Sequence, residues 1–197
     1  MREPPVTPVP PLRTGRLLLR GFQARDVDAY ATMMADPEVT RYLGDGRPLS
    51  RAEAWRQLAM FAGHWVLRGF GLWAVEEAST GAFLGRIGCF EPDGWPGFEI
   101  GYTLARTAWG RGYAREAAAE SLAYAHDTLG RRDVISIIRP ANAASIRVAT
   151  SLGAVQDGTI DFFGGPAWIY RYPAAGAPGG AGTLGGRRTA PQPGFPA

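Results

Sequence analysis

The hydrophobic pattern at the start of the chain predicts one strand and then two amphipathic helices. An apolar run over 16–20 predicts the strand, and apolar side chains recur at helical spacing after Asp26. Pro37 ends that helix, because the residue before a proline is pushed out of helical geometry. A second helix is expected to begin at Ser50, where Glu53 completes a capping-box pattern. Its predicted inner face consists of Trp55, Leu58, Ala59, Ala62, Trp65 and Val66.

Apolar and β-branched segments in the rest of the chain predict six further strands and two further helices. Short turns rich in glycine, proline and polar residues separate the first three of these strands, which favours an antiparallel meander. An alanine-rich helix is expected over 112–128, and another is expected to begin at Asn142. This order of elements predicts an α/β fold whose first half is largely antiparallel. The expected strands are 71–77, 82–91, 97–104, 134–138, 154–161 and 167–172.

Composition divides the 197 residues into a folded unit and two ends. Residues 1–11 hold five of the sixteen prolines and are expected to form an extended lead. Over 174–197 the chain is rich in glycine and proline and lacks acidic residues, a composition that favours a disordered tail. The folded unit is therefore expected at 12–173, which is long enough to need neither disulfides nor a structural metal.

The charge of the chain excludes some classes of function. All 21 cationic side chains are arginine, and the chain contains no lysine. With 18 acidic residues the net charge is +3, and it falls to +1 when the charged residues of the two ends are left out. So small a charge argues against a dedicated nucleic-acid-binding domain, which needs a concentrated basic face. No apolar run could span a membrane and no secretory signal precedes the fold, so a cytoplasmic location is expected.

The segment that links the third meander strand to the alanine-rich helix has the features of a phosphate-binding loop. Gly110 and Gly112 allow the backbone to approach an anion closely, and a helix start leaves about four N–H groups without partners. Arg111 and Arg115 flank this opening and can complement the anion. The pattern differs from a Walker loop and from a dinucleotide fingerprint. Taken alone, Gly-x-Gly before a helix is also typical of a plain tight turn.

Asn142 and Ser145 begin the next predicted helix and have two interpretations. Asparagine is a strong N-cap residue, which gives Asn142 a purely structural reason to be there. In the functional interpretation, the Asn142 side chain reaches across a split in the sheet toward an amide-bearing cofactor. Ser145 then steadies the cofactor arm or the start of the helix.

Three ordered motifs resemble those of the GNAT acetyltransferases. They are Thr14-x-Arg16-Leu-x-Leu-Arg20, then Glu99-Ile-Gly-Tyr-x-Leu104 with Trp109-Gly-Arg-Gly-Tyr-Ala-Arg-Glu-Ala117, and Asn142-x-x-Ser145 with Leu152-Gly153. The chain looks most like the ribosomal-protein N-acetyltransferase (RimJ/RimL-type) branch, and the resemblance covers about 12–173. It implies a GNAT-like fold, in which a central, mixed and mostly antiparallel twisted sheet of about seven strands is flanked by about four helices.

The resemblance also implies acetyl-CoA as co-substrate and assigns residues to it. In the family, main-chain groups that match Tyr102, Thr103 and Leu104 pair with the pantetheine arm. The family loop is usually Gln/Arg-x-x-Gly-x-Gly/Ala, and this chain has Trp109 in the first position. The side chain at that position is not the main phosphate ligand in the family. The pyrophosphate would lie on the amides of Gly110, Arg111, Gly112, Tyr113, Ala114 and Arg115.

The expected reaction is direct transfer of acetyl to a primary amine, which must lose a proton before it attacks. Glu99 is the candidate base, because it shares a strand face with Gly101 and Thr103 beside the residues matched to the cofactor arm. Its structural alternative is an ion pair with Arg86 on the preceding strand.

Charge also develops on the thioester oxygen and on the departing thiolate. A main-chain N–H near Leu104 is the expected donor to the thioester carbonyl. Tyr170 and Tyr102 are the candidate acids that protonate the thiolate, and both have the alternative interpretation of core or groove aromatics.

The remaining candidates have structural interpretations. His64 and His126 have no second ligand at metal-binding spacing, so no metal is expected. Cys89, the single cysteine, is expected to be a small core residue. Three further aromatic residues can line an acceptor groove or belong to the core: Trp73, Trp95 and Phe98.

The sequence leaves the acceptor open between a protein N-terminus and a small amine. Residues 38–50 and 92–97 are expected to shape its groove, because acceptor loops are the variable part of such folds. An acidic groove would favour polyamines or aminoglycosides, and an open neutral groove would favour peptides. The alternative function is a non-catalytic acyl-CoA-binding sensor or scaffold, which fits the cofactor motifs equally well. A homodimer is possible, and the sequence does not fix the oligomeric state.

Overall fold

Eight strands form one mixed sheet in the computed structural model, which describes residues 9–174. Their order across the sheet is β1-β2-β3-β4-β5-β6-β8-β7. Every neighbouring pair is antiparallel except β5 and β6, which are parallel. The strands are β1 (Leu12–Arg13), β2 (Leu17–Arg20), β3 (Leu72–Glu77), β4 (Phe83–Phe90), β5 (Glu99–Leu104), β6 (Ile135–Ile138), β7 (Val155–Phe162) and β8 (Gly165–Arg171).

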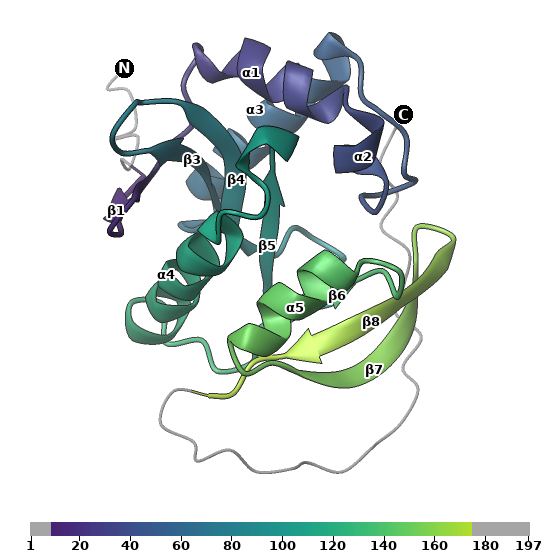
Figure 1. Ribbon diagram of the computed structural model, residues 1–197. Coiled ribbons are helices and arrows are strands. Elements are labelled where there is room, and N and C mark those ends of the chain that lie inside the picture. The colour runs from purple at the N-terminus through teal and green to yellow at the C-terminus, as the bar shows by residue number, and fades with distance from the viewer. Residues whose placement is uncertain (1–8, 175–197) are drawn as a thin grey trace, which may run out of the picture.

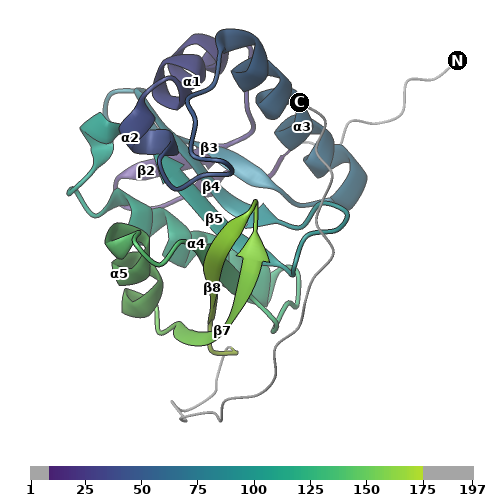
Figure 2. The ribbon, with the colours of Figure 1, turned by 90° about the vertical axis from the view of Figure 1, so that its right-hand side faces the viewer.

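The helices cover both faces of the sheet, with α1 and α3 on one face and α4 and α5 on the other (Figure 1, Figure 2). The predicted capping box begins α3, where Ser50 and Glu53 satisfy each other's main-chain N–H groups. The helices are α1 (Asp26–Met34), α2 (Pro37–Thr40), α3 (Arg51–Arg68), α4 (Tyr113–Asp127) and α5 (Ala143–Ser151), with a 3-10 turn at Arg106–Ala108.

Each face of the sheet has its own apolar core. Tyr30 of α1, Phe61 of α3 and Phe90 of β4 pack edge to face beneath the first pair of helices. Trp73 is fully buried on the other face, which α4 and α5 cover. Each such aromatic side chain contributes roughly 1.5–3 kcal/mol through the apolar area that it removes from water.

The sheet separates between β5 and β6, and this split positions the site. The only register pair that joins the two strands is Glu99 with Ile135. Beyond this pair, the half of the sheet formed by β6, β8 and β7 turns away from β5 (Figure 1). The last residues of β5 therefore face a gap instead of a neighbouring strand.

The α/β fold and the positions of the main elements confirm the sequence analysis, and two short elements were missed. The sheet has eight strands instead of about seven, because Leu12 pairs with Leu19 in a two-residue strand too short to give a periodic pattern. A fifth helix, α2, begins at Pro37, with Asp36 as its N-cap. The same Asp-Pro pair that ends α1 thus begins another helix.

The predicted inner face of α3 is wrong in part. Trp55 and Val66 are 54% and 70% exposed, and Ala59 and Ala62 are exposed as well. Only Leu58 and Trp65 are buried as expected. The buried stripe also includes Phe61, which packs against α1 and β4. Apolar residues recur on two sides of this helix, and only contact with the sheet decides which side faces inward.

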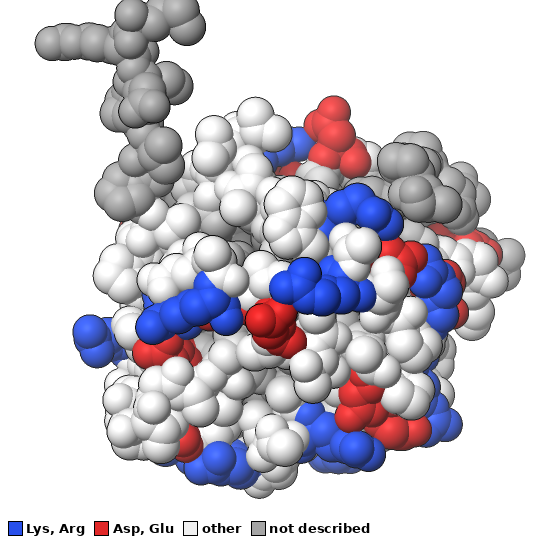
Figure 3. Space-filling view, turned by 90° about the horizontal axis from the view of Figure 1, so that it is seen from above, with Lys and Arg blue, Asp and Glu red and all other residues white. Residues whose placement is uncertain are grey.

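Charged side chains of both signs are interspersed over the face formed by the first helices (Figure 3). Because the chain has no lysine, every cationic side chain on this surface is an arginine. No helix within residues 9–174 is long and apolar enough to span a membrane. Pro10, in the predicted N-terminal lead, accepts a hydrogen bond from the Trp73 indole at 2.8 Å. The predicted tail at 174–197 lies, except for its first residue, outside the described residues.

Candidate functional site

The loop before α4 keeps its main-chain donors free. Gly110 and Gly112 have φ angles of 73° and 78°, a conformation that residues with a Cβ rarely adopt. Gly112 is the N-cap of α4, and the first main-chain bond of the helix runs from Glu116 N–H to the Gly112 carbonyl. Within residues 9–174, the N–H groups of 110–115 donate to no protein acceptor. The loop therefore presents free amides at the positive end of a 15-residue helix.

The segment before β2 holds this loop in place. Arg16 Nη1 donates to the Arg111 carbonyl at 2.9 Å, and Arg16 Nε donates to Glu116 Oε2 at 2.7 Å. The Thr14 hydroxyl donates to the same carboxylate at 2.5 Å. Arg16 thus compensates the negative charge of Glu116, which would otherwise repel an anion bound at the first turn of α4.

The two arginines predicted to flank the loop have different surroundings. Arg111 Nη2 donates to Glu77 Oε1 at 2.8 Å, and the Arg111 guanidinium lies 4.6 Å from the centroid of the Tyr113 ring. The Tyr113 hydroxyl donates to the same Glu77 oxygen. Arg115 is exposed and has no side-chain partner within the described part of the chain. Arg115 is therefore the side chain best placed to meet an anion, while Arg111 is held beside Glu77.

Strand β5 directs alternate main-chain groups into the gap. The Phe98 carbonyl accepts from Ile135 N–H at 2.9 Å, and the Ile100 carbonyl accepts from the Ser136 hydroxyl at 2.6 Å. By strand alternation, Tyr102 and Leu104 direct their main-chain groups the same way, where β6 has already turned aside. The Leu104 carbonyl accepts from the Trp109 indole N–H at 2.8 Å, so the main-chain groups that face the gap without a partner in residues 9–174 are those of Tyr102 and the Leu104 N–H.

Thr103 faces the other way along its backbone. Its carbonyl lies against β4, where a Cβ added to Gly85 would come within 2.2 Å of it. Its side chain therefore lies on the α1/α3 face of the sheet, opposite Arg86 in the register of β4. A main-chain contact of Thr103 with a ligand in the gap does not fit this orientation.

Across the gap, β5 is tied to the start of α5. The Tyr102 hydroxyl donates to the Ser145 carbonyl at 2.9 Å. Asn142 is the N-cap of α5, and its Oδ1 accepts from Ser145 N–H at 3.1 Å. Asn142 thus has the N-cap role that its structural interpretation predicts. Burial raises the pKa of the Tyr102 hydroxyl well above its ordinary value, so this side chain remains a protonated donor.

Glu99 lies where the sheet divides. Its carboxylate accepts from the Trp95 indole N–H at 2.7 Å and from Ile137 N–H of β6 at 3.3 Å. Burial raises the pKa of Glu99 to about 7, and the two donors oppose that rise because they stabilise the ionised form. The side chain is 9% exposed. A carboxyl group with this pKa exchanges its proton near neutral pH, as a general base must.

The expected alternative of a Glu99–Arg86 ion pair is absent from the described residues. Arg86 instead lies with its guanidinium carbon 4.9 Å from the centroid of the Phe61 ring, and its buried Nε has no hydrogen-bond partner. The Thr103 hydroxyl, 8% exposed, also lacks a partner. The α1/α3 face beside Glu99 thus holds two polar groups that the described part of the chain leaves unsatisfied.

The family model described as Acetyltransferase (GNAT) domain matches residues 16–155. The chain belongs to the GNAT family. The protein YkkB of Bacillus subtilis is 34% identical to this acetyltransferase over 167 residues, which cover 81% of this chain and 93% of the relative. The N-acetyltransferase p20 of Bacillus licheniformis is 29% identical and covers 76% of this chain and 84% of its own.

A solved acetyltransferase structure from Agrobacterium tumefaciens superimposes with a TM-score of 0.75 at 32% identity. The superposition covers 87% of this chain and 99% of the other. The family, its named relatives and the shared fold together show that this GNAT protein is an acetyltransferase. Acetyltransferases of this family take the acetyl group from acetyl-CoA.

Tyr170 of β8 and Tyr172, just beyond its end, lie on the opposite face of the acetyltransferase sheet from Glu99. Tyr170 is 5% exposed and pairs in register with Ser136. Two residues on, the Tyr172 hydroxyl lies 3.0 Å from the Ser136 hydroxyl, and burial raises the pKa of Tyr172 to about 12. Sequence analysis did not single out Tyr172, because only the pairing of β6 with β8 brings it beside β5.

The side chains without a catalytic assignment are structural in this GNAT fold. Cys89 is fully buried, and burial raises the pKa of its thiol far above the ordinary value. His64 Nδ1 lies 2.7 Å from the Phe70 carbonyl, and His64 Nε2 accepts from Glu91 N–H at 3.2 Å. Residues 9–174 contain no group of His, Cys, Asp and Glu side chains that could hold a metal ion.

Proposed function

We propose that this GNAT acetyltransferase moves the acetyl group of acetyl-CoA directly to a primary amine, with Glu99 as general base. The observation that carries the proposal is the position of Glu99. Its carboxyl group, with a pKa near 7, lies at the point where β5 and β6 separate. A base at this point lies beside the free main-chain edge of the gap.

The residues around the gap fit coenzyme A. Free amides at 110–115 suit its diphosphate, and the exposed Arg115 adds a cation. Tyr102 offers main-chain donors and acceptors to the amides of the pantetheine arm. When bound, acetyl-CoA supplies an acetyl thioester that an amine can attack.

The base has a defined task, because an alkylammonium ion has a pKa near 10 and must lose a proton before it attacks. Glu99 accepts that proton, directly or through water, on its carboxylate oxygen. Trp95 and Ile137 hold the carboxylate in place through the hydrogen bonds that they donate. These donors orient Glu99, while burial raises its pKa.

The other catalytic roles follow from the same strand. Leu104 N–H, directed into the gap, is the donor that stabilises negative charge on the thioester oxygen. The thiolate receives a proton from Tyr102 or Tyr170. Tyr102 is the stronger of the two candidates, because its hydroxyl reaches across the gap to Ser145.

We also infer that the acceptor is a peptide N-terminus, as in the ribosomal-protein N-acetyltransferase branch that the motifs resemble. The motif order Thr14-x-Arg16, Glu99 to Ala117 and Asn142-x-x-Ser145 supports this branch. An open surface beside the gap, lined by arginines as well as one aspartate, also favours peptides over polyamines.

Two measurements test the function. Calorimetric titration with acetyl-CoA should show binding, and the release of free thiol over a panel of amines should show turnover. A sensor or scaffold would bind acetyl-CoA and release no thiol with any amine. Replacement of Glu99 by glutamine should reduce the rate at neutral pH and restore part of it at high pH, where free amine is abundant. An unchanged pH profile would remove Glu99 from the mechanism.

A further inference from the structure

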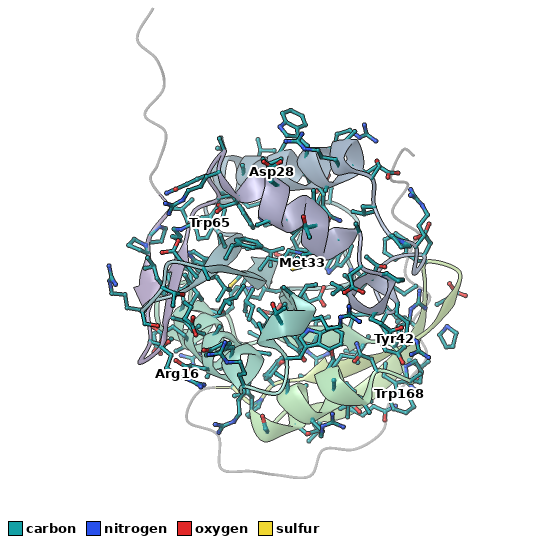
Figure 4. All side chains as sticks on the ribbon, turned by 45° about the horizontal axis from the view of Figure 1, so that its top comes forward. Arg16, Asp28, Met33, Tyr42, Trp65 and Trp168 are labelled. Carbon is teal, nitrogen blue, oxygen red and sulfur yellow. The ribbon has the colours of Figure 1, made fainter. Side chains whose placement is uncertain are left out.

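An open groove of about 450 Å³ lies between two loops that are distant in sequence. One wall is the segment 41–46, between α2 and α3, and the other is 163–166, which comprises the turn after β7 and the first two residues of β8. Residues 139–141, which link β6 to α5, form its base. Figure 4 shows Tyr42 on the same side of the molecule as Trp168 of β8 and on the other side from Arg16.

The groove connects to the candidate base through aromatic rings. Phe163, in its wall, has its ring centroid 6.4 Å from that of Trp95, whose indole N–H donates to Glu99. The base of the groove ends at Ala141, next to the N-cap residue Asn142. The groove therefore lies one ring contact from Trp95, the residue that donates to Glu99, and its base adjoins the start of α5.

One arginine joins the two walls. Arg139 Nη2 donates to the Gly44 carbonyl at 2.9 Å, and Arg139 Nη1 donates to the Pro166 carbonyl at 3.3 Å. A Cβ on Gly165 would come within 2.9 Å of Arg139 Nη1, so the guanidinium lies close against the hairpin turn. Within residues 9–174 Arg139 forms no ion pair, and its guanidinium is held by the main-chain carbonyls of Gly44, Phe163 and Pro166.

The other charged residues of the groove leave it cationic. Arg41 is the second arginine in the wall, and its only ion pair among the described residues is a long contact of 3.8 Å to the exposed Glu38. Asp45 is the single acidic residue that lines the groove, and Arg47 holds it at 3.2 Å. Two cations thus face one aspartate that already has a partner.

We propose that this groove receives the acceptor and selects peptides with an acidic side chain close to the amino group. The inference rests on the proposed function and adds the charge of the substrate to it. Arg139 and Arg41 attract the acidic side chain, which directs the amine toward Glu99. Polyamines and aminoglycosides carry only positive charge and are repelled by the same arginines. Arg139 and Arg41 are specificity-determining residues in this view.

The test compares short peptides that share their first residue and differ in the second, which is glutamate, glutamine or arginine. With the purified full-length enzyme and acetyl-CoA, thiol release gives kcat/KM for each peptide and for spermidine. The glutamate peptide should exceed the arginine peptide by about tenfold or more at low salt, and the ratio should shrink at high salt. A ratio near one, or a preference for spermidine, would overturn the inference.

Two variants and a control assign the effect to the groove. Arg139→Gln keeps hydrogen-bond donors but removes the charge, so the glutamate-to-arginine ratio should fall toward one. Arg41→Gln, at an exposed position, should lower the ratio without loosening the two walls. Arg56→Gln, on the outer surface of α3, should leave the ratio unchanged. If neither groove variant changes the ratio, the groove does not select the acceptor.

The outcomes distinguish failure of the proposed function from failure of the proposed role of the groove. If acetyl-CoA binds but no amine in the panel releases thiol, the proposed function fails. If thiol is released without any preference for an acidic neighbour, the proposed function stands and only the role of the groove is lost. Each ratio is measured within one variant, so a lower overall rate does not hide the result.

Discussion

Arg16 and Glu116 are joined by a 2.7 Å hydrogen bond between Nε and Oε2, although 100 residues separate them in sequence. The same guanidinium also holds the Arg111 carbonyl. The pair thus fixes the loop before α4 to the segment that leads into β2. It also keeps the negative charge of Glu116 away from the site of an anion.

Replacing Arg16 with alanine should weaken acetyl-CoA binding about fivefold to tenfold. The change frees the Glu116 carboxylate at the first turn of α4 and releases the loop carbonyl. Because the pair is partly exposed, the free energy of unfolding should change by less than about 1 kcal/mol. Calorimetry with acetyl-CoA measures the effect on binding. The double variant R16A/E116Q should recover part of the affinity, and equal loss in the single and double variants would contradict the electrostatic account.

The rate should follow the ionisation of Glu99. With a pKa of about 7, the rate on an amine of low pKa should rise about fivefold from pH 6 to pH 7 and then level off. Such an amine is already unprotonated over this range, so its own titration does not contribute, and the proton that Glu99 accepts is the one that the nitrogen loses as it bonds to the acetyl carbon. Glu99→Gln should abolish this step in the pH–rate profile. A step that persists in the variant would assign it to another group.

The same substitution should stabilise the fold at neutral and alkaline pH. The folded state holds the Glu99 proton more tightly than the unfolded state, so its stability contribution is lost as pH rises from the ordinary value of 4.5 toward 7. This loss amounts to about 3 kcal/mol at most, and glutamine avoids it. Urea unfolding of both proteins at pH 5 and pH 8 measures the difference. The gain from glutamine should be larger at pH 8, and a larger gain at pH 5 would reverse the sign and refute the prediction.

Trp95→Phe should shift the step in the pH–rate profile to higher pH. Phenylalanine keeps ring contacts with Phe90 and Phe162 but donates no hydrogen bond to Glu99. Loss of a donor to the ionised form raises the pKa of Glu99 further, so the step moves to higher pH. Trp55→Phe, on the exposed side of α3, is the matched control and should leave the profile unchanged. A lower rate with an unshifted profile would reduce Trp95 to a packing role.

Local sequence signals predicted most of the fold, since each main element carries its own signal. Ser50 and Glu53 give a capping box that needs no distant partner, and the meander strands are separated by short turns. The two-residue strand at Leu12–Arg13 has no such signal, because pairing with β2 creates it. The exposed side of α3 could not be predicted either, since its apolar residues recur on two faces.

The candidate site also has features that the sequence predicted and features that it could not predict. The free amides around Gly110 and Gly112 were predictable, because glycine readily adopts the positive φ angles that this loop needs and every helix start leaves N–H groups without partners. The partner of Arg111 was not, since Glu77 comes from a strand that only the sheet brings near. Likewise, the roles of Trp95 and Arg139 depend on contacts between segments that are far apart in the chain.

The cationic surface of this acetyltransferase is built from arginine alone. A guanidinium keeps its proton at any pH at which the protein is folded, so it cannot serve as an acetyl acceptor. None of the 197 residues therefore offers a side-chain amine for self-modification. Acetyl-CoA consumed in the absence of an added acceptor would report hydrolysis or acetylation of the chain's own α-amino group, and no side-chain amine would add to this background.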